Sequence, residues 1–431
     1  MIFKPPTDYS LFVERRNRLF DAIQEQHGWQ GPSLLLLIAD FEGTRHIFRQ
    51  DSSFYYLTGV TEPAVVACCY FDGEATLYVP RFGECRDKWV TTSVHVGLDP
   101  KKIGFNEIRY LGAPEKSYFF KPLFVQEQYS ALLDDLRSFV LAGGQVFTVI
   151  SPGQITSGFN CLLLERLCGW LPGLKDRVVD VTSELEGLRR CKDQYEISLM
   201  HHAAQVTMLA HEAAARVIAP GKFEYEIQAM VDHMFASAAG AQPAFPSIVA
   251  VGKNATVLHY GDRNCQLREG ELVVVDIGAE YGYYAADLTR TYPVNGMFSP
   301  RQRELYAIVL EVQKYLESIA LPGMYLRSDE HQEHSLHHIA LKCLEEYGVA
   351  QYMSHGLGHF LGLEVHDVGS LADPLMPGDV FTIEPGIYLP NEQCGIRIED
   401  DYVMVDDGVV CLSTELVKEP NEIETLMVEQ D

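Results

Sequence analysis

The second half of the chain carries carboxylates inside β-rich runs of residues. Asp276 interrupts an apolar run over 273–277, and Asp287 follows beyond a possible turn at 281–282. A two-residue turn there predicts that Asp276 and Asp287 lie directly opposite each other, with Cβ atoms ~4.5–5.5 Å apart. Like charges at this separation are destabilising, and an unpaired carboxylate in a buried strand is costly. The pair therefore predicts a bound cation.

A second β-rich segment near the C-terminus repeats this arrangement. If its turn is centred on residues 391–392, Glu384 and Glu399 face each other. Because side chains alternate along a strand, Arg397 shares a face with Glu399 whatever the turn. Four carboxylates on two hairpins can then surround one cavity.

Three histidines lie in the stretch SHGLGHFLGLEVHD, residues 354–367. His355 and His359 have the spacing of two zinc ligands on one helix face, but the HExxH motif needs a glutamate where Gly356 stands. Glycines at 356 and 358 also disfavour a helix. The pattern excludes a zincin site, and His359 is predicted to be a metal ligand outside a helix.

The predicted donors suit a pair of hard or borderline divalent ions, such as Mn²⁺, Zn²⁺ or Co²⁺, rather than a cysteine-rich structural zinc. Two such ions would clamp a water molecule, lower its pKa and polarise a carbonyl group, which is hydrolytic chemistry. Further groups are needed to bind substrate and to stabilise an oxyanion. The candidates are His259, His355, His366 and Arg397.

Two domains are expected to position these residues. In residues 1–180, an apolar strand over 33–41, a hairpin around Asp72-Gly73 and helical patterns over 126–141 and 160–170 predict an α/β domain. In residues 181–431, two helices followed by a β-rich hairpin occur twice. The helices are expected over 193–220, around 227–235 with an end at Gly240, and over 301–320 and 328–348, and the hairpins over 271–294 and 379–405.

Composition narrows the range of partners. The formal charge of −26 repels phosphate backbones and anionic lipids, so neither nucleic acid nor membrane is expected to bind. The N-terminal residues lack the pattern of a secretory signal, which predicts a cytoplasmic protein. The 10 cysteines include no CxxC pair, so reduced thiols are expected.

Four motifs resemble the successive signatures of the pita-bread metallopeptidases, in the branch of aminopeptidase P and prolidase. They are VVVDIGAEYGYYAADLTRTYPVNG, SHGLGHFLGLEVHDVG, TIEPGIY and GIRIEDD. The earlier segment FRQDSSFYYLTGVTEPAVV is similar to the N-terminal domain of aminopeptidase P. The resemblance implies an α+β fold, with an aminopeptidase P-like α/β domain over 1–180 and a catalytic pita-bread domain of duplicated helix-helix-hairpin halves over 181–431.

The resemblance also implies an activity and a set of roles. The activity is hydrolysis of the bond between an N-terminal residue and a following proline, by two metal ions that are usually manganese. The implied metal ligands are Asp276, Asp287, His359, Glu384 and Glu399, with Asp287 and Glu399 bridging. Glu384 is also implied to accept a proton from the bridging water. The implied substrate contacts are His259, His355 and His366, Arg397 is implied to support the carboxylates, and a homodimer or homotetramer is expected.

Two other functions remain open at this level. A prolidase, which cleaves Xaa-Pro dipeptides, shares every metal ligand, whereas an inactive pita-bread binding protein typically loses ligands. Arg49, Asp51 and Trp89 in the first domain are tempting substrate contacts but are left outside the predicted site. A histidine group at 331, 334, 337 and 338 is interpreted as the solvated face of one helix.

Overall fold

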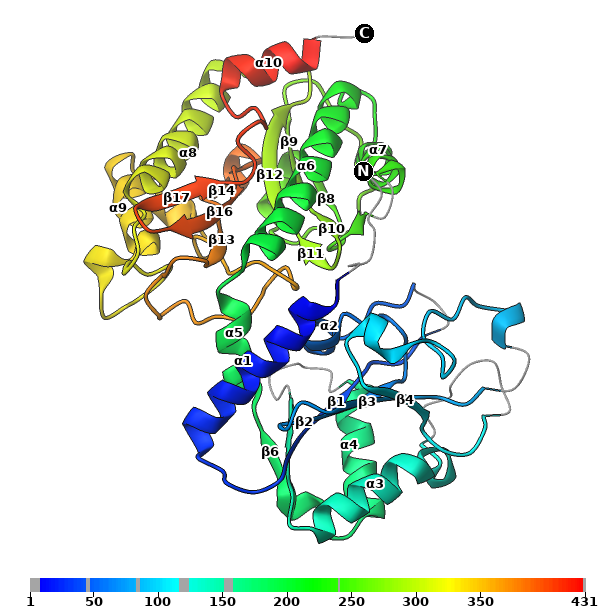
Figure 1. Cartoon of the computed structure of the whole chain (residues 1–431). Helices are drawn as coiled ribbons and strands as arrows, with labels where there is room; N and C mark the ends of the chain where they lie inside the picture. Colours follow the sequence, from blue (N-terminus) through cyan, green and yellow to red (C-terminus); the bar gives the residue numbers. More distant parts are fainter. Residues whose placement is uncertain are drawn as a thin grey trace. The chain divides into compact units, whose positions relative to one another are not determined.

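The computed structural model describes residues 8–43, 47–82, 86–115, 124–150, 158–238 and 241–428 (Figure 1). The chain divides into two compact units, with a boundary between Arg189 and Arg190. We call residues 6–189 the N-terminal unit and residues 190–431 the C-terminal unit. Both contain helices and strands, which confirms the predicted α+β class. None of the helices in the described ranges combines the length and the apolar composition needed to cross a bilayer.

The described residues of the N-terminal unit form a mixed sheet with the strand order β4-β3-β2-β1-β5-β6. The strands are β1 (Ser33–Ile38), β2 (Val66–Tyr70), β3 (Ala75–Val79), β4 (Glu107–Tyr110), β5 (Gln145–Thr148) and β6 (Val178–Asp180). The helices are α1 (Ser10–His27), α2 (Ser52–Thr58), α3 (Ser130–Leu141), α4 (Phe159–Trp170) and α5 (Thr182–Arg190). Strand β1 is buried along its whole length, and β2 and β3 form the predicted hairpin around Asp72-Gly73.

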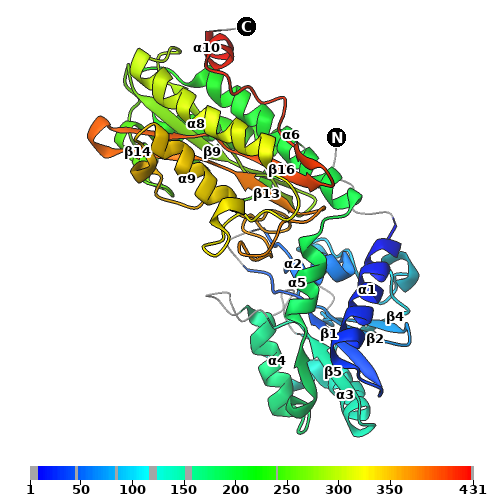
Figure 2. The ribbon, with the colours of Figure 1, turned by 90° about the vertical axis from the view of Figure 1, so that its left-hand side faces the viewer.

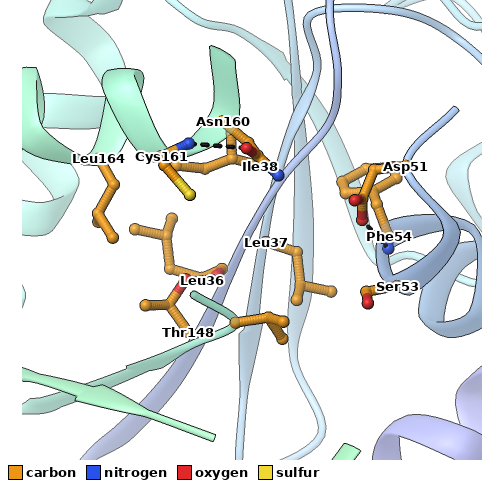
Figure 3. Close-up of a pocket in the computed structure, with 11 residues that line it drawn as sticks. Leu36, Leu37, Ile38, Asp51, Ser53, Phe54, Thr148, Asn160, Cys161 and Leu164 are labelled. Carbon is orange, nitrogen blue, oxygen red and sulfur yellow. Dashed lines mark hydrogen bonds between the residues drawn. The ribbon is translucent and has the colours of Figure 1, made fainter. Parts of the chain in front are cut away.

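A small cavity of the N-terminal unit lies beside the first turn of α2 (Figure 3). Asp51 lines this cavity, and its carboxylate accepts a hydrogen bond from the Phe54 N–H at 2.8 Å. Arg49 Nη1 donates to Ser52 Oγ at 3.0 Å, and the Trp89 side chain is exposed. Helix capping therefore accounts for the position of Asp51 directly before α2.

The C-terminal unit contains two successive pairs of long helices. They are α6 (Gln194–Val217), α7 (Glu224–Ser237), α8 (Pro300–Ile319) and α9 (Leu336–Glu346), and α10 (Pro420–Val428) follows near the C-terminus. Helix α6 begins with a capping box, in which the side chains of Asp193 and Glu196 each accept a hydrogen bond from the backbone N–H of the other residue. Figure 2 shows α8 and α9 side by side against the strands of this unit.

The prediction of one helix over 328–348 is wrong at its beginning. Helix α9 starts only at Leu336, because Ser335 caps it and the preceding backbone is tied to Tyr325. His331 and His334 consequently lie before the helix and are exposed, whereas His337 in its first turn is buried. The four histidines therefore do not share one helical face.

Short sheets of the C-terminal unit support the site. The first half contributes β7 (Gln242–Pro243), β8 (Ile248–Val251), β9 (Leu272–Ile277), β10 (Ala279–Tyr281), β11 (Tyr284–Ala285) and β12 (Leu288–Pro293). The second half contributes β13 (Val380–Ile383), β14 (Gly386–Leu389), β15 (Cys394–Arg397), β16 (Asp400–Val405) and β17 (Gly408–Cys411). Helix α6 packs against β10 and β12, while α8 packs against β13 and β15. The predicted duplication of helix-helix-hairpin halves is confirmed.

The predicted register of the first hairpin is wrong by two residues. Asp276 pairs with Thr289 rather than Asp287, because the turn is formed by Gly282 and Tyr283. Both turn residues have positive φ, +60° and +74°, as a type I′ turn requires. A shift of two residues keeps the same side chains on the same face, so Asp276 and Asp287 still share one face of the hairpin.

The predicted register of the second hairpin is confirmed. Gly386 pairs with Arg397 and Leu389 with Cys394, around a short 3₁₀ turn at Pro390–Glu392. The pairing of Ile383 with Asp400 continues the same register on the other side of Glu384 and Glu399. These two glutamates therefore lie opposite each other at the point where β13 and β16 pass into β14 and β15.

His211 in α6 is completely buried and hydrogen-bonded at both ring nitrogens. Nε2 lies 3.0 Å from the Leu288 carbonyl oxygen, and Nδ1 lies 3.2 Å from the Tyr292 hydroxyl. A carbonyl oxygen can only accept, so Nε2 carries the proton and Nδ1 can accept from the tyrosine. Burial, assisted by the charge of Arg290, lowers the pKa of His211 from 6.5 to about 3.

We expect His211 to destabilise the folded protein in acid. Below pH 6.5 the unfolded chain binds a proton at this residue, whereas the folded protein does so only near pH 3. The free energy of unfolding therefore decreases as the pH falls from 6.5 towards 3, by up to about 1.4 kcal/mol per pH unit. Urea unfolding of His211→Gln should show a shallower decline than wild type in this window, and equal slopes would contradict the assignment.

Candidate metal centre

Every residue of the predicted site lines one cavity of the C-terminal unit. The cavity has a volume of about 370 Å³, within the range of small-molecule sites. The predicted residues that line it are His259, Asp276, Asp287, His355, His359, His366, Glu384, Arg397 and Glu399. An adjoining cavity lined by Phe245, Ile248 and Val365 shares His259 and His366 with the first.

The acidic residues reach this cavity from the ends of paired strands. Asp276 lies near the end of β9, and Asp287 directly precedes β12. Glu384 follows β13, and Glu399 precedes β16. Because strand ends are fixed by the ladders on either side, the two hairpins hold their carboxylates in one place without a flexible linker.

His359 lies in the middle of the carboxylates. Its Nε2 is 3.3 Å from Asp287 Oδ2 and 3.8 Å from Glu384 Oε1. Its Nδ1 is 3.1 Å from the Phe360 carbonyl oxygen, which can only accept, so the proton is on Nδ1 and the lone pair of Nε2 faces the acids. One donor atom each from Asp287, His359 and Glu399 lie within 4.8 Å of one another.

The backbone beside His359 depends on a glycine. A Cβ on Gly358 would lie 2.0 Å from the Thr382 carbonyl oxygen, so a larger residue cannot occupy this position. The adjacent His359 N–H and the Thr382 N–H both bond across the same interface. The glycine thus lets the histidine segment lie directly against β13.

The carboxylates are buried too closely to be stable as an isolated cluster of charges. Asp276, Asp287 and Glu399 expose only 7%, 6% and 2% of their surface. Burial and neighbouring carboxylates raise the pKa of Asp287 and of Glu399 well above the usual range, and burial raises the pKa of Glu384 to about 7. Among the described residues, Asp276 Oδ1 and Asp287 Oδ1 are buried without a hydrogen-bond partner. These features fit a site for divalent cations.

Arg397 neutralises one side of the cluster. Its Nη2 lies 2.5 Å from Asp276 Oδ2, and its Nε donates to Thr289 Oγ1 at 3.2 Å. The Thr289 hydroxyl in turn donates to Glu399 Oε2 at 2.6 Å. Arg397 is therefore placed to orient Asp276 directly and Glu399 through Thr289.

The other histidines surround this cluster at its edge. His355 Nδ1 donates to the Gly356 carbonyl oxygen at 2.7 Å, and its Nε2 accepts from the Tyr388 hydroxyl at 2.8 Å. The His366 ring centroid lies 4.2 Å from that of His359. Burial, with nearby positive groups, lowers the pKa of both His355 and His366 to about 4, so both rings are neutral near pH 7.

Sequence reasoning missed Tyr388 and Thr289. Tyr388 accepts a hydrogen bond from Arg397 Nη1 at 2.8 Å and donates to His355, so it links two predicted residues. Strand alternation could have indicated it, since 384, 386 and 388 share one parity along the hairpin. Gly386 leaves room for this link, because a Cβ there would lie 2.6 Å from the Tyr388 hydroxyl.

Comparisons with known proteins agree with this geometry. Residues 198–406 match metallopeptidase family M24, and residues 12–117 match the aminopeptidase P N-terminal domain. The Xaa-Pro aminopeptidase of Haemophilus influenzae is 31% identical to the chain, over 96% of each sequence. The chain belongs to the Xaa-Pro aminopeptidase family.

Other members of the wider group are also similar over most of their length. The zinc-substituted aminopeptidase P of Escherichia coli, solved in complex with product, has a TM-score of 0.81 and 28% identity over 98% of both chains. The human Xaa-Pro dipeptidase is 27% identical over 94% of this chain and 90% of its own. Membership of the family establishes a metallo-exopeptidase, and the buried Asp-His-Glu group fits its need for divalent metal ions.

Proposed function

We propose that this protein removes an N-terminal residue that precedes proline, with two divalent metal ions. The observation that carries the proposal is the convergence of Asp276, Asp287, His359, Glu384 and Glu399 on one cavity. The full-length similarity to Xaa-Pro aminopeptidases supports the same substrate class, namely peptides with proline in the second position.

The five converging residues would hold the metal ions. An oxygen-rich donor set with one imidazole favours Mn²⁺, with Zn²⁺ and Co²⁺ as alternatives. When bound, two such ions supply polarisation of the scissile carbonyl group and activation of the attacking water. Donor atoms of Asp287 and Glu399 lie within 4.8 Å of each other and of His359, which supports their proposed bridging role.

Glu384 is the proposed proton carrier. Its carboxylate lies in the cavity between His355 Nδ1, at 3.6 Å, and His359 Nε2, at 3.8 Å. Beside bound cations this carboxyl group is ionised, so it can accept the proton of the attacking water and later deliver it to the leaving proline nitrogen. Glu384 takes one proton from water and gives one to the proline nitrogen, so it ends the reaction ionised, as it began.

The outer histidines are proposed to contact the substrate, and Arg397 to support the carboxylates. The neutral ring of His366 can donate one hydrogen bond to an oxyanion without adding a full charge, whereas His355 would have to exchange its bond to Gly356 or Tyr388 to do so. His259 and His366 also line the adjoining cavity, whose Phe245 and Ile248 offer an apolar surface to the substrate. Arg397 keeps Asp276 in place and has its own pKa raised further by Tyr388 and Asp276, so it stays charged.

Tyr388→Phe should lower kcat by about tenfold or more. The change leaves a buried Arg397 N–H without its acceptor and removes the donor to His355, at a cost of about 1–3 kcal/mol. Tyr402→Phe serves as a control, because Tyr402 is equally buried and bonds Glu317 instead. Steady-state kinetics with both variants test the assignment. A kcat of Tyr388→Phe equal to that of Tyr402→Phe would show that Tyr388 does not support the site.

Substrate length tests the proposed activity against its closest alternative. The Mn²⁺-loaded protein should hydrolyse an Xaa-Pro-Yaa tripeptide faster than an Xaa-Pro dipeptide, as judged by kcat/KM. Preference for the dipeptide would instead support a prolidase, in line with the similarity to the human Xaa-Pro dipeptidase. Failure to bind Mn²⁺ and to cleave either peptide would support an inactive binding protein.

A cytoplasmic location and a homodimer or homotetramer remain proposals. Cell fractionation tests the first, with recovery in the membrane pellet as the contrary result. Light scattering of the purified protein tests the second, and a monomer mass would contradict it.

A further inference from the structure

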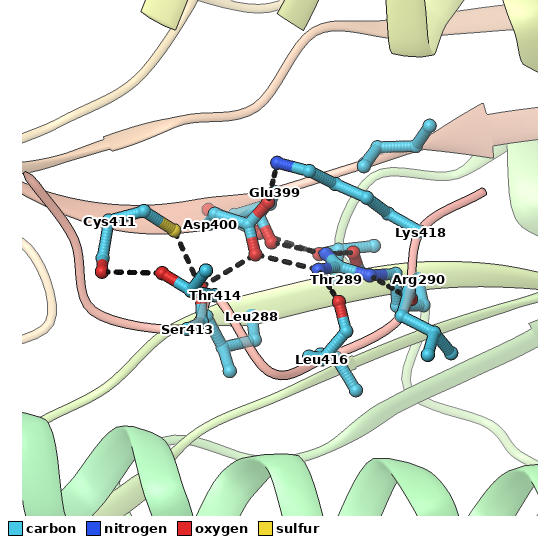
Figure 4. Close-up of polar contacts among 12 residues, drawn as sticks. Leu288, Thr289, Arg290, Glu399, Asp400, Cys411, Ser413, Thr414, Leu416 and Lys418 are labelled. Atoms are coloured by element: carbon cyan, nitrogen blue, oxygen red, sulfur yellow. Dashed lines mark hydrogen bonds and ion pairs between the residues drawn. The ribbon is translucent and has the colours of Figure 1, made fainter. Parts of the chain in front are cut away.

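The buried side chain of Arg290 contacts the backbone of Glu399 (Figure 4), and Arg290 does not line the cavity. Arg290 Nε donates to the Val417 carbonyl oxygen at 3.0 Å, and Nη2 donates to Leu416 O at 3.1 Å. Nη1 donates to the carbonyl oxygens of Thr289 and Glu399, at 2.9 and 2.8 Å. The fifth donor goes to Asp400, so the guanidinium uses all of its N–H groups.

Asp400 balances the charge of Arg290. Its Oδ1 lies 2.7 Å from Arg290 Nη2 and accepts from Ser413 at 2.6 Å. Its Oδ2 lies 3.0 Å from Lys418 Nζ. Two basic side chains and one hydroxyl group therefore hold this buried carboxylate in place.

Gln313 of α8 connects this ion pair to the second hairpin. Its Nε2 carries two hydrogens and lies 3.1 Å from Asp400 Oδ2 and 3.2 and 3.3 Å from the carbonyl oxygens of Ile383 and Ile398, so one N–H is shared between two of these acceptors. These two residues directly precede Glu384 and Glu399 in the chain. The side chain of Gln313 is fully buried, so no solvent competes for these bonds.

We infer that Arg290, Gln313 and Asp400 form a positioning cluster that fixes Glu384 and Glu399 for metal binding. The cluster bonds the backbone of Glu399 and of the residues before both glutamates, while none of its own three residues lines the cavity. Groups that orient metal ligands typically change metal affinity by about 10–100-fold when they are removed. The inference rests on the proposed function, because it takes the two glutamates to be metal ligands.

Gln313→Met tests the cluster with little change of volume. We expect a folded protein whose Mn²⁺ affinity, measured by titration calorimetry, falls about 10–100-fold. At limiting Mn²⁺ its kcat should fall, and excess Mn²⁺ should restore much of it. Should the methionine variant not fold, Gln313→Asn shortens the same side chain by one methylene and is expected to give the same loss of affinity.

Tyr306→Phe is the matched control. Tyr306 is a fully buried residue of the same helix, and its hydroxyl donates to the Lys418 carbonyl oxygen at 3.0 Å, away from both glutamates. The Tyr306→Phe variant should have a lower thermal unfolding temperature than wild type, but a Mn²⁺ affinity within twofold of wild type. Equal Mn²⁺ affinities for a folded Gln313 variant and for wild type would overturn the inference. Absence of Mn²⁺ binding by the wild-type protein would instead overturn the proposed function.

Discussion

Asp287→Asn is expected to abolish metal-dependent activity and yet to stabilise the metal-free protein. In the absence of cations, the buried Asp287 carboxylate is opposed by Asp276, Asp401 and Glu384, which together with burial raise its pKa. Asparagine keeps the shape and removes one charge, so the metal-free protein loses a source of repulsion. The change also removes a proposed direct ligand, and the activity should fall by more than the ~100-fold typical of groups that only orient ligands.

Thermal unfolding with and without Mn²⁺ separates the two effects. Wild type should gain stability on adding Mn²⁺, since a ligand at about 1,000 times its dissociation constant adds about 4 kcal/mol. Asp287→Asn should start from a higher unfolding temperature and respond little to Mn²⁺. Asp401→Asn is the comparison for the metal response, because Asp401 is buried beside Asp287 and its Oδ2 accepts the Asp287 N–H; this variant should also relieve repulsion in the metal-free protein but should keep the response to Mn²⁺. If Asp287→Asn keeps the full Mn²⁺ response, Asp287 is not a ligand.

Glu384→Gln is expected to lower kcat by about 10²–10⁴-fold, the usual contribution of a general acid–base group. Glutamine fits the same space between His355 and His359 but cannot carry a proton. Because Glu384 is also a proposed metal ligand, the kinetics must be measured at saturating Mn²⁺, where only the proton-transfer defect remains.

The matched control for this change is Glu317→Gln. Glu317 lies on α8 and accepts from Tyr402 and Lys418, away from the cavity. The Glu317→Gln variant should have a kcat near the wild-type value. A Glu384→Gln enzyme that turns over within twofold of wild type would show that another group moves the proton.

The first hairpin shows that the face on which a strand residue lies can be predicted from sequence even when the position of the turn is predicted wrongly. The expected turn at 281–282 was displaced to Gly282 and Tyr283, where Tyr283 takes a positive φ of 74°. A non-glycine residue at this φ is unfavourable, so local preference alone does not select it. The site prediction survived because strand parity is unchanged by a shift of two residues, and Asp276 stays on the face of Asp287.

The beginning of α9 shows the opposite case. The polar residues over 328–335 are compatible with a helix by their pattern, and the histidines have helical spacing. The backbone of this segment instead pairs with Tyr325, and Ser335 caps a helix that begins at Leu336 rather than at residue 328. Contacts with other parts of the chain outweighed a weak local preference.

The sequence by itself determined most of the elements and the candidate ligand residues. Alternation in the strands, the capping box at Asp193 and the carboxylates within apolar runs each depend on neighbouring residues, so they can be read along the chain. What only the tertiary structure decided is how distant segments meet. Tyr388 bridges His355 and Arg397, and Gln313 reaches the backbone before Glu384 and Glu399 from a helix far away in sequence. Such contacts arise when buried polar groups find partners in three dimensions, and no local pattern of residues records that choice.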